Sequence, residues 1–149
     1  MADDDVEVLN GDELPELTYE EKVAFACPIA QPMANKKLAK RLYKLARKAR
    51  RNKKAECSIK GIVKAIEKKN IVGIVVLAGD ASPMDSISHL PLICEEHRIP
   101  YCYVASRLDL GASVASVSTI SALLIMKDDE YEDLYDKCHA MVDDLPIPA

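Results

Sequence analysis

The sequence has little glycine and lacks the motifs of the common nucleotide-binding loops. Only five of its 149 residues are glycine. Neither GxGxxG nor GxxxxGK[ST] occurs, so the usual phosphate-cradling signatures are missing. No apolar run approaches the roughly 20 residues of a membrane-spanning helix, and the acidic start lacks the apolar core of a secretory signal. We therefore expect neither a membrane partner nor a small-molecule substrate.

Cysteine is scarce, odd in number and scattered. No CxxC pair and no Cys/His cluster has the spacing of metal ligands. We expect reduced, mostly buried thiols in an intracellular protein, with no metal site and no cofactor. The five residues are Cys27, Cys57, Cys94, Cys102 and Cys138.

A catalytic motif is missing as well. None of His89, His97 and His139 has a nucleophile and an acid at a motif spacing, although spacing does not test a triad assembled in space. Asp80 follows an apolar run, where α/β proteins often place working groups, but its neighbours supply no second carboxylate. We expect a protein without enzymatic activity.

Charge is distributed unevenly behind a formal net charge of −4. Residues 2–21 contain nine acids and no base, whereas residues 36–54 contain eleven Lys or Arg and no acid. From residue 127 onward, eight acids face two bases. We interpret residues 1–21 as a disordered acidic tail. Because like charges on one helix repel one another, the basic block favours a nucleic-acid or acidic protein partner over a merely solvated face.

The centre of the chain predicts a βαβ unit. Ile71–Ala78 is a short apolar run rich in β-branched residues, which is typical of a buried strand. Ser82 and Pro83 predict the start of a helix, which Pro91 kinks or divides in two. Tyr101–Val104 predicts a second, parallel strand.

The flanking segments extend this unit to a layered α/β domain over residues 22–149. We expect a three-layer α-β-α sandwich around a small mixed four-stranded sheet. The additional predicted elements are helices at 36–54, 59–69 and 129–142, a helical turn at 106–111, and strands at 55–58 and 120–126.

Two segments have features suited to binding a polyanion. The helix over residues 36–54 has one apolar stripe, and its other faces carry Lys or Arg, beginning with Lys36, Lys37 and Lys40. In the next helix Ser58 is a predicted N-cap, and Lys60 and Lys64 lie one turn apart. Free backbone N–H groups beside two lysines suit a phosphate, although many helix starts have this composition.

Residues 77–112, LAGDASPMDSISHLPLICEEHRIPYCYVASRLDLGA, resemble the central segment of the kink-turn RNA-binding protein family. That family includes large-subunit ribosomal proteins and box C/D core proteins. The lead-in AQPMANKKLAKRLYKLARKA and residues 130–136 are most similar to its eukaryotic H/ACA ribonucleoprotein branch. The resemblance covers about residues 23–148.

The resemblance implies a non-catalytic nucleolar scaffold. Such a subunit binds H/ACA guide RNA, assembles with the pseudouridine synthase subunit and two small core proteins, and supports the isomerisation of uridines in ribosomal RNA during ribosome biogenesis.

The resemblance also implies where RNA is bound, and this chain departs from the family there. Lys60 and Lys64 match the family's helix start, but Ser58 replaces its glycine and Gly61 its glutamate, which removes an acceptor for a base edge. The loop at residues 114–119 has no glycine, charge or proline. We expect salt-sensitive RNA binding with weak structural specificity. The expected RNA-binding residues are Ser58, Lys60, Gly61, Lys64, Asp80, Ser116, Val117 and Ser118, with Lys36, Lys37 and Lys40.

Two other hypotheses remain open. One is a diverged paralogue that acts only as a protein-interaction module, with weakened kink-turn binding. The other is an enzyme or small-molecule binder that uses a cleft beyond Asp80. Reversing the charge at Lys60 and Lys64 separates RNA binding from the first, and copurification with a pseudouridine synthase separates it from the second.

Overall fold

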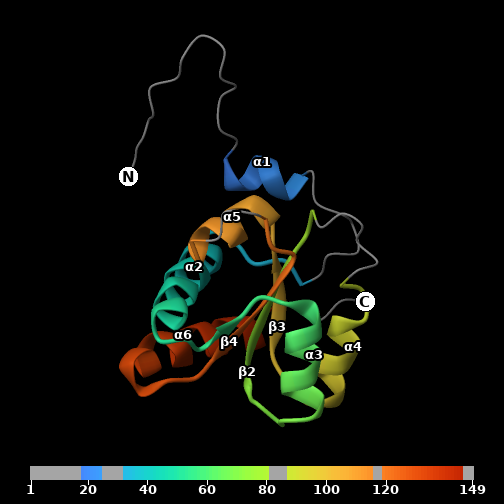
Figure 1. Cartoon of the computed structure of the whole chain (residues 1–149). Coiled ribbons are helices and arrows are strands. Elements are labelled where there is room, and N and C mark those ends of the chain that lie inside the picture. Colours follow the sequence, from blue (N-terminus) through green and yellow to red (C-terminus); the bar gives the residue numbers. More distant parts are fainter. Residues whose placement is uncertain (1–17, 25–31, 81–86, 116–118, 146–149) are drawn as a thin grey trace.

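A four-stranded mixed sheet lies between two layers of helices (Figure 1). The computed structural model describes residues 18–24, 32–80, 87–115 and 119–145. The strands are β1 (Ala55–Glu56), β2 (Gly73–Ala78), β3 (Tyr101–Val104) and β4 (Ala122–Met126). The helices are α1 (Tyr19–Ala24), α2 (Lys36–Arg51), α3 (Ile59–Glu67), α4 (Leu90–Glu96), α5 (Arg107–Ser113) and α6 (Glu132–Asp143), with a 3-10 turn, η2 (Asp129–Tyr131), before α6.

The strand order is β1-β4-β2-β3. β2 and β3 are parallel, as a βαβ unit requires, and β4 is antiparallel to both β2 and β1. Every residue of β2 is buried, because helices cover both faces of the sheet. The predicted three-layer α/β fold with a small mixed sheet is confirmed.

The helices divide between the two faces of the sheet. α2, α5 and α6 lie on one side, and α3 and α4 lie on the other (Figure 1). α2 packs with one apolar stripe, and the Asn35 side chain caps its start by accepting a hydrogen bond from the Leu38 N–H at 2.8 Å. The buried residues of that stripe are Leu38, Ala39, Leu42, Leu45, Ala46 and Ala49.

Pro91 lies in the first turn of α4 rather than at an interior kink. The first turn of a helix has no intrahelical partner for its N–H groups, so a proline costs little there. The chain thus starts a helix at Leu90. Ser82 and Pro83, the expected start of this region, lie outside the described residues.

The folded part reaches further toward the N-terminus than residue 22. α1 begins at Tyr19, inside the segment that we expected to be a disordered tail. Its Tyr19 hydroxyl donates to the Ala34 carbonyl at 2.6 Å, and Lys22 Nζ contacts Asp109 Oδ2 at 2.6 Å. Two tertiary contacts therefore hold a helix too short to be stable alone. Residues 1–17 lie outside the described part.

Three of the cysteines are buried thiols. Burial raises the pKa of Cys94 and Cys102 to about 12, and that of Cys138 to about 11. Cys57 is half-buried, and Cys27 lies outside the described residues. None of the helices that the structure describes has both the length and the apolarity needed to cross a membrane.

Candidate nucleic-acid interface

The start of α3 lies at the end of the sheet where β2 ends and β4 begins. β1 runs antiparallel to β4, with Glu56 opposite Leu124, so the chain leaves β1 toward the start of β4. Leu77, near the end of β2, pairs with Ala122 at that same end. The topology therefore brings the N-terminus of α3 toward Asp80, which follows β2.

The N-terminus of α3 presents lysines beside a partly apolar groove. Ser58 is the N-cap and accepts a hydrogen bond from the Gly61 N–H at 3.4 Å. The side chains of Lys60 and Lys64 are exposed. Between them and His89 lies an open groove of about 410 Å³. Its lining residues are Ile59, Lys60, Val63, Lys64, Glu67, Lys68 and His89, so three lysines and one acid border an apolar floor.

A carboxylate lies against Gly61, although residue 61 itself carries none. Glu56 Oε2 accepts a hydrogen bond from the Ser58 N–H at 3.1 Å. A Cβ atom on Gly61 would lie 2.5 Å from Glu56 Cδ. The missing side chain at residue 61 thus leaves the space that the Glu56 carboxyl group occupies. Our expectation that Gly61 removes an acceptor from this helix start was incomplete, because β1 supplies another.

Replacing Gly61 by alanine is expected to change the free energy of unfolding by less than about 1 kcal/mol. Alanine favours the helix by about 1 kcal/mol over glycine, and displacing Glu56 loses one charge-assisted hydrogen bond of similar value. The displaced atoms end a flexible side chain, which can move. Urea denaturation measures the difference, and a loss above about 2 kcal/mol would mean that Glu56 is fixed in place.

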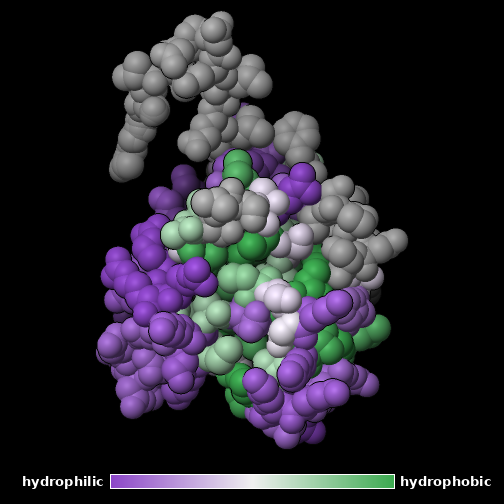
Figure 2. All heavy atoms as spheres, in the orientation of Figure 1, coloured by the Kyte–Doolittle hydropathy of each residue, from purple (hydrophilic) through white to green (hydrophobic). Residues whose placement is uncertain are grey.

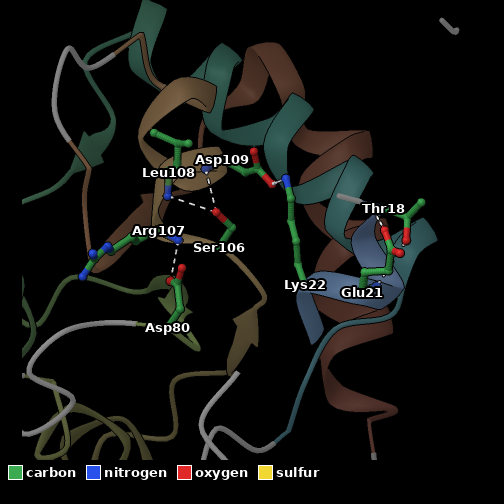
Figure 3. A network of polar contacts seen from close by, with 8 residues as sticks. All are labelled: Thr18, Glu21, Lys22, Asp80, Ser106, Arg107, Leu108 and Asp109. Carbon is green, nitrogen blue, oxygen red and sulfur yellow. Dashed lines mark hydrogen bonds and ion pairs between the residues drawn. The ribbon is translucent and has the colours of Figure 1, made fainter. Parts of the chain in front are cut away.

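Asp80 has a structural partner at the start of α5. Its Oδ1 accepts a hydrogen bond from the Arg107 backbone N–H at 2.7 Å (Figure 3). Ser106 caps the same helix by accepting from the N–H groups of Leu108 and Asp109. Asp80 therefore connects the end of β2 to the start of α5, and one of its oxygens is already occupied within the protein.

Arg107 is a cation at this end of the sheet that our reading of the sequence did not select. Its side chain extends away from the Lys22–Asp109 ion pair (Figure 3). Its carbonyl accepts from the Ile120 N–H at 3.4 Å, which places it beside the end of the loop that contains Ser116, Val117 and Ser118. Those three residues lie outside the described part of the chain. The signal available in the sequence was a basic residue directly after Ser106, where the helical turn that follows the strand at residues 101–104 begins.

The basic helix α2 does not join this surface. Residues 32–34 pair with the outer edge of β3, where the Ala34 N–H donates to the Tyr103 carbonyl at 2.8 Å. From there α2 crosses its face of the sheet and leads into β1, the strand at the opposite edge. Lys36, Lys37 and Lys40 are exposed at its start, on the other face from α3 (Figure 1). The structure thus divides the predicted RNA-binding residues between two surfaces.

One further group of possible metal ligands lies at the C-terminal ends of α3 and α4. Ligand atoms of Glu67, Glu96 and His97 lie within 4.8 Å of one another. All three side chains are exposed, where carboxylates commonly cluster without an ion, so we assign no metal to them.

Comparison with known proteins identifies a family. The model of the ribosomal protein L7Ae/L30e/S12e/Gadd45 family matches residues 40–135. The chain is 41% identical over 136 residues to a Xenopus tropicalis H/ACA ribonucleoprotein complex subunit 2-like protein, covering 91% of both chains. It is 42% identical over 134 residues to the Drosophila melanogaster H/ACA ribonucleoprotein complex subunit 2, covering 90% of this chain and 84% of that protein.

A solved structure agrees with these sequence relatives. The Giardia lamblia 15.5kD RNA binding protein superimposes with a TM-score of 0.74 at 25% sequence identity, covering 78% of this chain and 97% of that one. The family match and the relatives also confirm the resemblance to the H/ACA ribonucleoprotein branch. The chain is a member of the ribosomal protein L7Ae/L30e/S12e/Gadd45 family.

Proposed function

We propose that this protein is a non-catalytic, RNA-binding core subunit of an H/ACA ribonucleoprotein. In that role it supports guide-RNA-directed pseudouridylation of ribosomal RNA and ribosome biogenesis, in the nucleus and specifically the nucleolus. The names of its relatives support membership of the complex. The observation that carries RNA binding is the start of α3, where Lys60 and Lys64 are open to solvent beside an apolar groove.

The chemistry of this helix start suits an RNA backbone and a base edge together. Lys60 and Lys64 neutralise phosphates and release their counterions, and the first backbone N–H groups of α3 favour an anion. Glu56 repels phosphate, but its carboxylate accepts hydrogen bonds from the amino groups of bases. Arg107 adds a cation beside the loop that contains Ser116–Ser118. Kink-turn recognition is therefore proposed for α3, Glu56 and Arg107 acting together.

The proposed partners are H/ACA guide RNA, a pseudouridine synthase subunit and small H/ACA core proteins. Exposed leucines favour a protein-contacting role beside RNA binding, since Leu92 is 67% and Leu108 65% exposed. They also keep the alternative of a protein-interaction module open. Purification of the tagged full chain, with sequencing of bound RNA, tests both: synthase without guide RNA would favour the alternative.

Binding of a kink-turn RNA to the wild-type protein is expected to weaken steeply with salt. Neutralising about three or four phosphates predicts a slope of log Kobs against log salt near −2 to −3. Filter-binding titrations over a range of salt concentrations measure it, with a plain duplex as the control RNA. Tight kink-turn binding with a shallow slope would contradict a mainly electrostatic interface, and no binding of either RNA would overturn the proposed function.

A further inference from the structure

The exposed cations of α2 form one straight stripe. Lys37, Lys40, Lys44, Arg47 and Arg51 are all exposed and follow one another at alternating intervals of three and four residues. That spacing keeps side chains on one face of a helix. At a rise of 1.5 Å per residue, the stripe is about 21 Å long, with a positive charge roughly every 5 Å.

Several acids of the neighbouring elements have other partners. On α6, which packs against α2, Glu132 and Asp136 lie 3.5 and 3.9 Å from Lys127 Nζ. Asp143 contacts His139 at 3.1 Å. Within the residues that the structure describes, the salt bridges include no α2 cation.

Two acids are held close to the C-terminal end of the stripe. The Asn52 side chain donates to Asp128 and Glu130, at 2.9 and 2.8 Å, and holds both carboxylates near that end of α2. The strongest positive potential is therefore expected over Lys37, Lys40 and Lys44, in the first half of the helix.

The α2 stripe and the α3 helix start are separate surfaces. They lie on opposite faces of the sheet (Figure 1), and stacked layers are about 10 Å apart, so about 20 Å separates the two helix axes. Figure 2 shows hydrophilic surface over α2 and α6 and again over α3 and α4, with a strip of apolar surface between them. A short segment of single strand bound at one surface does not reach the phosphate-binding groups of the other.

We propose that the α2 stripe binds a second RNA segment, so that one chain holds two segments at once. The proposal rests on the proposed function, because an RNA-binding protein meets phosphate chains at high local concentration. A row of regularly spaced cations, without a salt bridge to any described residue, is complementary to a phosphate backbone and carries no base specificity. The occupant is thus a single- or double-stranded RNA segment bound through its backbone, while α3 binds the other segment.

The test counts short RNAs per chain. An oligouridine of about four nucleotides matches the length of the stripe and lies at the lower end of single-strand site sizes, and native mass spectrometry at low salt is expected to show two bound to the wild type. Lys40→Glu with Lys44→Glu should leave one, Lys60→Glu with Lys64→Glu should also leave one, and combining all four should leave none. Donor- and acceptor-labelled oligouridines should show energy transfer on the wild type and lose it in each double variant.

The matched control carries the same change of charge elsewhere. Lys69→Glu with Lys137→Glu should still bind two RNAs. Both lysines are exposed. The α2 variant should remain folded, because glutamates at these positions gain Lys neighbours one turn away, and its thermal unfolding midpoint checks this.

The possible outcomes are distinct. One RNA per wild-type chain, or two on the α2 variant, overturns the second site while leaving the proposed function intact. If the stripe binds an acidic protein instead of RNA, the wild type should bind one RNA per chain. No RNA on the wild type overturns the proposed function itself.

Discussion

Reversing both lysines at the start of α3, Lys60→Glu with Lys64→Glu, is expected to weaken binding of a kink-turn RNA about a hundredfold. Each reversal removes one phosphate contact and adds a repulsive charge, worth on the order of 1.4 kcal/mol, or tenfold in Kd. The slope of log Kobs against log salt should become shallower by about 1.4, because two phosphate contacts are lost.

The measurement is a filter-binding titration of the full chain at several salt concentrations. Lys60 and Lys64 are exposed and have no ion-pair partner among the described residues, so the fold should be unaffected, and circular dichroism checks this. Lys69→Glu with Lys137→Glu, at two other exposed lysines, is the control for net charge. If RNA binding survives the α3 reversals unchanged, the start of α3 is not the kink-turn site.

Replacing Gly73 by alanine is expected to destabilise the fold by about 3 kcal/mol. Gly73 is the first residue of β2 and pairs with Met126 of β4. A Cβ atom there would overlap the Ile125 carbonyl oxygen and lie 3.0 Å from Leu124 Cδ1. The obstacle is backbone of the neighbouring strand, so β2 and β4 must separate, and overpacking of this kind costs roughly 1–3 kcal/mol before any ladder hydrogen bond is lost.

Urea denaturation with a far-ultraviolet probe measures this loss, and the midpoint of thermal unfolding should fall by roughly 10 °C. Gly61→Ala is the matched control: its new Cβ meets only the end of the Glu56 side chain, so the same substitution should be nearly neutral there. Equal effects at the two glycines would contradict the assignment of the cost to β4 backbone.

Local pattern predicted most of the elements because their signals are short-range. An apolar β-branched run predicted β2, and alternating Lys and Leu at helical spacing predicted α2 with its Asn35 cap. The start of α1 was missed because Tyr19–Ala24 has an acidic composition. That helix depends on Ala34 and Asp109, which are distant in sequence and invisible to any local pattern.

The residues of the candidate site were likewise predictable from the sequence only in part. The resemblance selected Lys60 and Lys64 by position along the chain, and both are exposed at a helix start. Glu56 was not selected, because its carboxylate reaches Gly61 only when β1 pairs with β4 and turns directly into α3. Asp80 was selected as a contact for RNA, which stays a prediction, and its hydrogen bond to the backbone of Arg107 follows from the tertiary structure.

The sequence by itself determined the layered α/β fold and the presence of two cationic segments, because both follow from residue type and spacing along the chain, and its resemblance to known proteins indicated the family. Only the tertiary structure decided that these segments face away from each other. Lys40 and Lys60 are twenty positions apart, but between them the chain passes through β1 at the edge of the sheet, so α2 and α3 cover opposite faces. Charge composition does not encode that separation, since strand pairing sets it.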